Sequence, residues 1–336
     1  MKSLRNLAVD IIKEEELQNN PHYKLKLYNK TKKEYTFYYR IDRDVLVTEI
    51  QDKFVQMEFD QETMKFINET PRWNQISNSM NWLMSWMYTK TDIMGYLNMG
   101  KMYILSTSQF KHMLFRMEPQ QQQSSEPQQQ IVKYESLLDI GSGCGEITLR
   151  LMPLFHNTLA TEASRGMINS LKRKSINSLY CTDLNHCREL KEKQFSVVSL
   201  LNVLDRCEKP LTLLKDIKNY LQPGKGKLLL AVVYPFEPYV EFGGIENEPL
   251  ETLDINNDST EEFINSLYKN VLSPLELEIE SFTVAPYISE GDTVYKNYAL
   301  QDIVLVLKHS NNITPIVSNN NINNNNEESV NINIVN

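Results

Sequence analysis

Three glycines crowd into five positions of the segment LLDIGSGCGEITLRLM, which spans residues 137–152. The chain of 336 residues holds 11 glycines in all, so a loop with Gly141, Gly143 and Gly145 needs a physical cause. The apolar run before the loop predicts a strand, and the run after it predicts a helix. A glycine turn between them lets a ligand lie against bare backbone near the helix N-terminus. The segment therefore predicts a binding loop.

Acidic residues accompany this loop at the expected ends of three strands. Asp139 precedes the loop, Glu162 lies about twenty residues beyond it, and Asp183 follows the next expected strand. An acid at the position of Glu162 can accept from both hydroxyls of a ribose, and Asp183 can accept from an adenine amino group. Asp139 can meet an ammonium of the ligand through water or backbone. Each acid alone fits a solvated loop or a helix cap, but the series of three predicts a site for an adenosyl ligand.

Two adenosyl ligands compete for this loop, a dinucleotide and S-adenosylmethionine. The dinucleotide fingerprint G-x-G-x-x-G needs its third glycine one residue later than Gly145, where this chain has Glu146. We expect the Glu146 carboxylate to face, and to repel, the pyrophosphate of a dinucleotide. S-adenosylmethionine has no phosphate and carries a positive sulfonium, so it tolerates a nearby acid. The loop therefore favours S-adenosyl-L-methionine as the cofactor and methyl transfer as the reaction.

The chain divides into five regions by composition. From residue 131 to 309, short apolar runs alternate with amphipathic segments, which predicts a parallel sheet covered by helices on both faces. Together with methyl transfer, this pattern predicts an α/β fold with a Rossmann-like, seven-stranded class I methyltransferase sheet. Residues 46–117 are expected to form a helical accessory region, with Trp82 and Trp86 on one helix face as a buried seam or a substrate-lining wall. The remaining regions are an N-terminal arm (1–45), a Gln-rich linker or insertion (118–130) and an Asn-rich disordered tail (310–336).

Composition narrows the class of function further. The formal net charge of -8 argues against a general nucleic-acid or anionic-membrane binder, because both need a basic face. The four cysteines and five histidines show no metal-ligand spacing, so no metal site is expected. Cysteines without paired spacing are typical of a reducing compartment. No secretory leader and no apolar run of membrane-spanning length is evident, so we expect an intracellular protein, in the cytoplasm, without a membrane span.

Longer stretches of the sequence carry a family resemblance. The segment SLLNVLDRCEKPLTLLKDIKNYLQPGKGKLLLAVVYPFEPYVE at residues 199–241 resembles the methyltransferase-like protein 9 family, also called DREV. Three further segments are similar to that family: KFVQMEFDQETMKFI (53–67), TDIMGYLNMGKMYILS (91–106) and APYISEGD (285–292). The resemblance spans roughly residues 40–308. These motifs are long and specific, unlike the glycine loop.

The resemblance implies a protein-histidine methyltransferase. Members of this family methylate the pros nitrogen (Nδ1) of histidines in His-x-His segments of other proteins, where x is small. The donor-binding residues implied or predicted in this chain are Asp139, Gly141, Gly143, Glu162, Asp183 and Asn202. The catalytic residues implied on the acceptor side are Asn202, Asp205, Tyr287 and Tyr298.

The implied chemistry is consistent with the residues. A histidine ring with a pKa near ~6.5 is already a nucleophile when neutral, but either nitrogen can react. Asp205 is suited to hold the proton on Nε2 and to stabilise the cation as the methyl arrives, while Asn202 and the tyrosines orient ring and donor. Asp205 could instead form an ordinary ion pair with Arg206, and the tyrosines could serve edge packing. A small-molecule methyltransferase and a non-catalytic S-adenosylmethionine-binding protein of the same fold stay open as alternatives.

Overall fold

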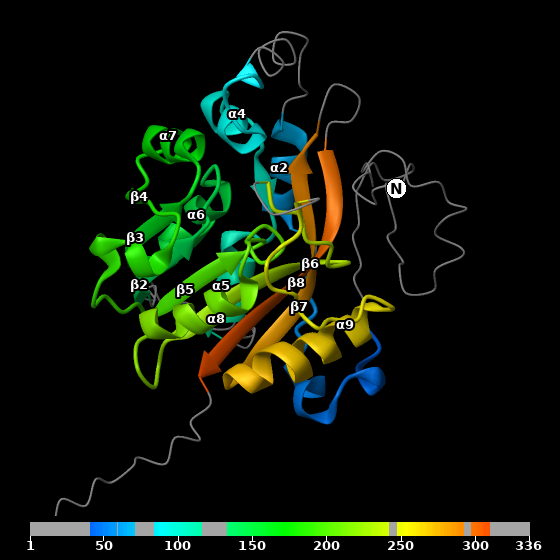
Figure 1. Cartoon of the computed structure of the whole chain (residues 1–336). Helices are drawn as coiled ribbons and strands as arrows, with labels where there is room; N and C mark the ends of the chain where they lie inside the picture. Colours follow the sequence, from blue (N-terminus) through cyan, green and yellow to red (C-terminus); the bar gives the residue numbers. More distant parts are fainter. Residues whose placement is uncertain are drawn as a thin grey trace, which may run out of the picture.

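The computed structural model describes residues 41–58, 60–70, 84–115, 133–241, 247–291 and 297–309, which form one sheet of eight strands with helices around it (Figure 1). The strands are β1 (Met102–Tyr103), β2 (Tyr134–Ile140), β3 (Phe155–Glu162), β4 (Ser178–Tyr180), β5 (Val197–Leu201), β6 (Lys227–Tyr234), β7 (Leu277–Glu290) and β8 (Asn297–His309). The α-helices are α2 (Gln61–Glu69), α4 (Lys90–Tyr96), α5 (Thr107–Phe115), α6 (Glu146–Leu151), α7 (Arg165–Arg173), α8 (Pro210–Ile217) and α9 (Thr260–Ser266). The expected linker and tail, and nearly all of the expected N-terminal arm, lie outside the described residues.

The sheet has the strand order β1-β7-β8-β6-β5-β2-β3-β4. Neighbouring strands from β4 to β6 pair in parallel, and β8 runs antiparallel between β6 and β7. This arrangement confirms the Rossmann-like class I methyltransferase fold predicted from the sequence. The number of strands differs from the prediction by one, because β1 pairs antiparallel with β7 from a region expected to be helical. A strand of two residues is too short to show the alternation from which strands are predicted.

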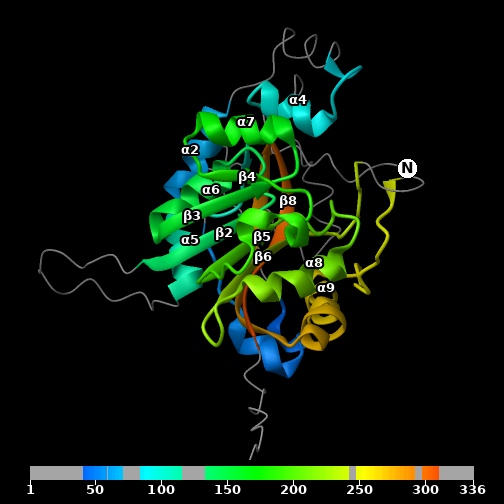
Figure 2. The same ribbon diagram turned by 60° about the vertical axis from the view of Figure 1, so that its left-hand side comes forward.

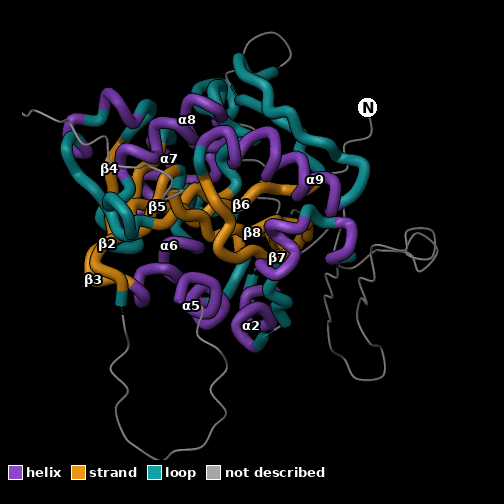
Figure 3. Tube along the Cα trace, turned by 90° about the horizontal axis from the view of Figure 1, so that it is seen from below, coloured by secondary structure: helices purple, strands orange, loops and turns teal. Residues whose placement is uncertain are grey.

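Helices α8 and α9 cover one face of the sheet, and α5 and α6 cover the other (Figure 3). Leu138 of β2 packs in one core cluster with Leu214 and Ile217 of α8. Its neighbour Leu137 belongs to a second cluster, which includes Phe110 of α5. Successive side chains of a strand point to opposite faces, so neighbours in sequence enter different cores. All five residues of β5 are buried, as expected of a parallel strand enclosed on both sides.

Part of the expected accessory region packs directly on this sheet. Val55 donates its backbone N–H to the Phe282 carbonyl of β7 at 2.8 Å, and the rings of Phe54 and Phe282 lie 5.5 Å apart. The aromatic seam expected nearby is not supported at Trp86, whose side chain is 80% exposed. Trp82 lies outside the described residues. The contact between this region and the sheet is made by β1, by the Phe54 segment and by α5, whose Phe110 shares a core cluster with Leu137 of β2.

Helix α4 lies beside α7 at one end of the molecule (Figures 1 and 2). Two glycines permit this contact, because a Cβ at Gly95 would overlap the backbone of Gly166, and a Cβ at Gly166 would overlap the backbone of Asp92. Backbones approach this closely only where no side chain intervenes. Since α7 begins shortly after β3 ends, the contact brings α4 to the carboxyl edge of the central strands.

Candidate active site

The three glycines of the loop after β2 all have positive φ angles: 67° at Gly141, 55° at Gly143 and 84° at Gly145. Glycine adopts this region at no steric cost. A Cβ at Gly141 would lie 2.6 Å from Val203, and one at Gly145 would lie 2.7 Å from Ile176. Nothing lies within 4 Å of a Cβ at Gly143. Packing therefore requires the first and third glycines, whereas Gly143 faces open space in which a ligand can approach the backbone.

Glu162 ends β3 beside Gly143. One carboxylate oxygen accepts the Gly143 N–H at 2.8 Å, and the other accepts the Ser164 N–H at 2.9 Å. Burial raises the pKa of Glu162, and these two hydrogen bonds oppose the rise. Each carboxylate oxygen keeps a further lone-pair site, so ribose hydroxyls can be accepted beside the backbone donors. The residues present therefore fit the adenosyl group of S-adenosylmethionine.

Asp139 is buried under the same loop. Its two carboxylate oxygens accept hydrogen bonds from Ser199 of β5 and Thr148 of α6, both at 2.6 Å. Burial is the main cause that raises the pKa of Asp139 to about 6. The carboxyl group thus joins α6 to the central strands, and its predicted contribution to binding the donor's ammonium stays a prediction.

Asp183 lies on the surface after β4, apart from the buried acids. Its side chain is 50% exposed and accepts from the backbone N–H of Asn185 at the start of the 3-10 turn Leu184–His186. The same carboxylate lies 2.8 Å from His186 Nδ1, and this contact is the first cause of its lowered pKa. Of the predicted donor residues, Asp183 is the one that the structure does not bring into the buried group. Its contact with adenine stays a prediction.

Asn202 and Asp302 form a hydrogen-bonded pair at the carboxyl end of β5. Asn202 directly follows β5 with a φ of 56°, and its Nδ2 donates to Asp302 Oδ2 at 2.7 Å. Asp302 lies on β8, is fully buried, and was not among the residues predicted from the sequence. Burial raises its pKa well above the usual range; Asn202 opposes this rise and the charge of Asp205 adds to it. The only sequence signal was an acid at the head of the apolar run DIVLVL (302–307).

Asp205 is 4% exposed and pairs with Arg206, whose Nε lies 3.0 Å from its Oδ2. The ion pair considered as an alternative role for Asp205 is therefore present. The half-exposed Arg206 guanidinium lies 6.0 Å from the ring centre of Tyr239. After burial, the charge of Asp205 is among the causes that raise the pKa values of Tyr287 and Asp302. The carboxylate thus serves the ion pair and also lies within electrostatic reach of Tyr287 and Asp302.

Tyr287 and Tyr298 project from the same face of neighbouring strands β7 and β8. Tyr287 pairs in register with Leu300, two residues from Tyr298, and this face of β8 also carries Asp302. The Tyr287 hydroxyl donates to the sulfur of Met102 on β1 at 2.6 Å. Burial, followed by the charge of Asp302, raises the pKa of Tyr287. Both predicted tyrosines therefore share a face with the buried acid on β8.

A second group that the sequence did not reveal ties α4 to the donor side. Asp92 accepts from the Ser164 hydroxyl at 2.7 Å, and Ser164 donates its own N–H to Glu162. Asp92 thus fixes the residue that holds the donor-side carboxylate. At the start of α4, Glu241 accepts from the Thr91 hydroxyl at 2.6 Å. Helix α4 therefore joins the end of β3 to the segment that follows β6.

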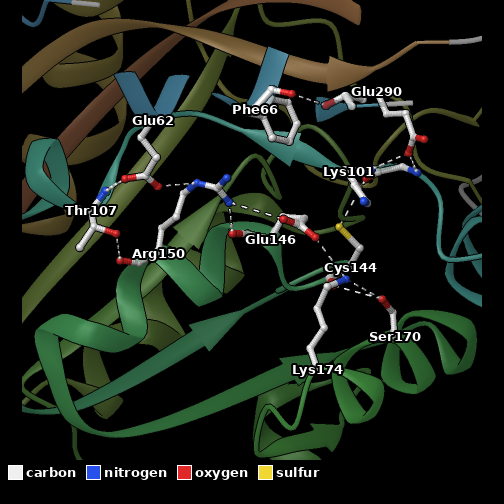
Figure 4. A network of polar contacts seen from close by, with 12 residues as sticks. Glu62, Phe66, Lys101, Thr107, Cys144, Glu146, Arg150, Ser170, Lys174 and Glu290 are labelled. Atoms are coloured by element: carbon white, nitrogen blue, oxygen red, sulfur yellow. Dashed lines mark hydrogen bonds and ion pairs between the residues drawn. The ribbon is translucent and has the colours of Figure 1, made fainter. Parts of the chain in front are cut away.

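A chain of ion pairs connects α6, which follows the glycine loop, with α2 and with the residue that ends α7 (Figure 4). Glu146 lies 3.6 Å from Arg150 and 3.4 Å from Lys174, and Arg150 also lies 3.0 Å from Glu62 of α2. The Glu146 carboxylate is paired with these two cations, whereas the sequence suggested an unpaired carboxylate facing the ligand. Repulsion of a pyrophosphate by Glu146 therefore does not decide between the two adenosyl ligands.

Within the part of the chain that the structure describes, neither a grouped set of metal-ligating side chains nor a membrane-spanning helix is present. No three His, Cys, Asp or Glu side chains there are grouped as metal ligands. None of the helices in the same residues combines the length and the apolar character needed to cross a bilayer.

The strand order, the glycine loop and the buried acid at the end of β3 together define a class I methyltransferase. The DREV methyltransferase family model matches residues 38–309, and the chain belongs to this family. The resemblance noted in the sequence is thereby confirmed. So are the expectations of an S-adenosylmethionine-dependent methyltransferase and of S-adenosyl-L-methionine as its cofactor.

Several solved structures resemble the chain at low identity. The N-methyltransferase NodS from Bradyrhizobium japonicum WM9, in complex with S-adenosyl-l-homocysteine, is 13% identical with a TM-score of 0.37, over 60% of this chain and 85% of NodS. A ribosomal protein L11 methylase from Lactobacillus delbrueckii subsp. bulgaricus is 14% identical with a TM-score of 0.32, over 53% of this chain and 72% of its own. A TehB-like methyltransferase from Corynebacterium glutamicum is 16% identical with a TM-score of 0.34, over 53% of this chain and 82% of its own.

We predict that donor affinity depends on Glu162 directly and on Asp92 through Ser164. Glu162→Ala removes a charged acceptor and is expected to weaken S-adenosylmethionine binding about a hundredfold; Asp92→Ala only loosens that acceptor and is expected to cost roughly tenfold. Isothermal titration calorimetry measures both, with Asp258→Ala at an exposed acid as the control. Unchanged affinity in Asp92→Ala, or tight binding of NAD by the wild-type chain, would contradict this assignment.

A second prediction concerns stability and pH at Asp139. Because its folded pKa of about 6 lies above the ordinary 3.8, the stability it contributes is fully present below pH 4 and is lost as pH rises through 6. The amide of an Asp139→Asn variant does not titrate; its carbonyl oxygen can still accept from one of the two hydroxyls of Ser199 and Thr148, and its NH2 group can donate to the other. As pH rises from 4 to 7.5, the free energy of unfolding of this variant should therefore increase by about 3 kcal/mol relative to that of the wild type. Urea unfolding across this range measures the gain, and a difference that does not vary with pH would refute the buried-acid assignment.

Proposed function

We propose that this chain is an S-adenosylmethionine-dependent protein-histidine methyltransferase that methylates the pros nitrogen, Nδ1, of histidines in His-x-His segments of other proteins, where x is small. The observation that carries the proposal is a set of buried hydrogen-bond acceptors beside the donor loop. Asn202 Oδ1 is buried and has no hydrogen-bond partner among the described residues, and the neighbouring Asp205 carboxylate is 4% exposed. Membership of the DREV family supports the same reading. Acceptors of this kind suit a nucleophile that presents an N–H.

A neutral imidazole has one nitrogen with a proton and one with a lone pair. A site that accepts the N–H holds one nitrogen and leaves the other free to react. With Asp205 accepting from Nε2–H, the proton stays on Nε2 and Nδ1 becomes the nucleophile. Asp205 is suited to this role because Arg206 and its buried position keep the carboxylate in one place.

Methyl transfer adds a positive charge to the ring. When bound, S-adenosylmethionine supplies a methyl group on a sulfonium, so the N–C bond forms as the S–C bond breaks and a neutral thioether is left. The Asp205 carboxylate stabilises the methylated cation, which loses its Nε2 proton to solvent after release. Tyr287 and Tyr298 are proposed to hold the ring plane in line with the donor, because alignment supplies much of the rate in such reactions.

The substrates are proposed to be separate proteins and not nucleic acids. None of the five histidines of this chain lies two residues from another, so the chain contains no His-x-His segment; they are His22, His112, His156, His186 and His309. We propose an intracellular, cytoplasmic site of action. The four cysteines, which are free thiols, support this location.

The direct test is incubation of the full chain with methyl-labelled donor and a short peptide that contains His-Ala-His. Mass spectrometry and NMR of the product are expected to show methylation at Nδ1, with much slower reaction of a matched peptide that has Ala in place of one histidine. Methylation at Nε2 would contradict the proposed geometry. Absence of any product while the donor is bound would favour a small-molecule methyltransferase or a non-catalytic binding protein.

We predict that Asp205→Asn separates catalysis from folding. The amide reaches the same ring but carries no charge to stabilise the methylated cation, so turnover at saturating donor should fall on the order of 10²–10³-fold. Arg206→Gln is the matched control, since it breaks the same ion pair and leaves the carboxylate. If the pair served structure alone, both variants would lose thermal stability alike and retain their turnover per folded molecule. A single-turnover assay beside thermal melting distinguishes these outcomes.

A further inference from the structure

The Asn202–Asp302 pair contains two polar atoms that no described residue satisfies. Asn202 Nδ2 donates to Asp302 Oδ2 at 2.7 Å, whereas Oδ1 of Asn202 and Oδ1 of Asp302 are buried without a hydrogen-bond partner in the described part of the chain. Buried polar atoms in proteins are nearly always hydrogen-bonded, and each exception has a cost. A pair that leaves two such atoms is poorly suited to a purely structural role.

The position of this pair is set by the backbone. Asp302 lies between Val233 of β6 and Ala285 of β7, and neither neighbour carries a side-chain donor. Asn202 is held by its own N–H, which donates to the Ala231 carbonyl of β6 at 3.0 Å. Asn202 is thus the described side chain that hydrogen-bonds to Asp302, and the contact fixes which end of the Asn202 amide points toward β8.

The orientation of this amide has a chemical consequence. With its NH2 directed to Asp302, Asn202 presents its carbonyl oxygen on the other side, and a carbonyl oxygen accepts only from an N–H or O–H. In the reverse orientation it would present an NH2 group, which donates to a nitrogen lone pair. For an imidazole, the first orientation selects the protonated nitrogen and the second selects the bare one.

We propose that Asp302 is a positioning residue for nitrogen selection: by accepting from the Asn202 NH2, it directs the Asn202 carbonyl oxygen to the N–H of the acceptor ring. This inference rests on the proposed histidine methylation. Asn202 then acts on the same proton-bearing side of the ring as Asp205, and both leave the other nitrogen free for the methyl group. Burial raises the pKa of Asp302, and the nearby charge of Asp205 adds to this rise.

Two substitutions of Asp302 separate this role from packing. Asp302→Leu keeps the branched shape and removes the acceptor; Asp302→Asn keeps a carbonyl acceptor. At saturating donor and peptide, Asp302→Leu is expected to lower kcat on the order of 10²-fold and to yield Nε2-methylated product. Asp302→Asn should restore kcat to within a few-fold of wild type, with Nδ1 as the product. Asp302→Val, suited to a buried strand, replaces Asp302→Leu if that variant does not fold.

A double-mutant cycle tests whether Asp302 acts through Asn202. Asn202→Gly removes the side chain and tolerates the positive φ at this position. In that background Asp302→Leu should change kcat by less than about twofold, because its partner is already gone. Two outcomes would overturn the proposal. The first is that the losses of kcat in the two single variants multiply in the double variant; the second is that Asp302→Leu leaves the ratio of Nδ1-methylated to Nε2-methylated product unchanged.

The hydrogen bond itself can be followed without turnover. In protein labelled with 15N-asparagine, the Asn202 side-chain NH2 signals are those that disappear in Asn202→Gly. They should shift in Asp302→Leu and stay near their wild-type positions in Asp302→Asn. If the wild-type chain methylates no histidine peptide, the proposed function falls while these signals still report on the pair. If the Asn202 NH2 signals do not shift in Asp302→Leu, the proposed positioning role of Asp302 is wrong, whether or not the chain methylates histidine.

Discussion

Burial of acid at the carboxyl edge of the sheet is the constraint on which the site depends. Asp139, Glu162, Asp205 and Asp302 are all at most 8% exposed, and a buried carboxyl group is costly unless it is hydrogen-bonded or paired. A different part of the fold meets that requirement for each: hydroxyls of β5 and α6, the backbone of the glycine loop, a guanidinium, and an amide. The result is one edge at which the residues proposed to bind the donor and the acceptor are each held by a separate part of the fold.

Elements outside the central parallel strands complete these supports. Helix α4 reaches Glu162 through Asp92 and Ser164, and the close approach of Gly95 to α7 is what allows that reach. The antiparallel strand β8 contributes Asp302 at the point where β5 ends. The strand order places β8 beside β6. Asp302 therefore contacts Asn202, which lies one hundred residues earlier in the sequence.

Much of this architecture was readable in the sequence because it depends on local patterns. The glycine loop, an acid at the end of β3, and apolar runs of strand length are all local features of the sequence, and the family segments pointed to Asn202, Asp205 and the two tyrosines as candidates for the acceptor site. The contact of Asp302 with Asn202 could not be predicted, because it depends on the pairing of β8 with β6 and not on the residues next to Asp302. Glu146 was misjudged in part for a related reason: Lys174 reaches it only because the end of α7 folds back onto the glycine loop, whereas Arg150 is a local partner four residues along α6. The strand β1 was too short to leave a pattern.

We propose that the ring to be methylated lies at this edge with its protonated nitrogen facing Asn202 and Asp205. A crystal structure of the chain with S-adenosylhomocysteine and a His-Ala-His peptide tests it most directly. We expect Nε2 of the target ring to lie within hydrogen-bond distance of Asp205 or the Asn202 carbonyl oxygen, and Nδ1 to point to the sulfur. A ring that binds with Nε2 toward the sulfur, or a peptide seated away from β5 and β8, would contradict it.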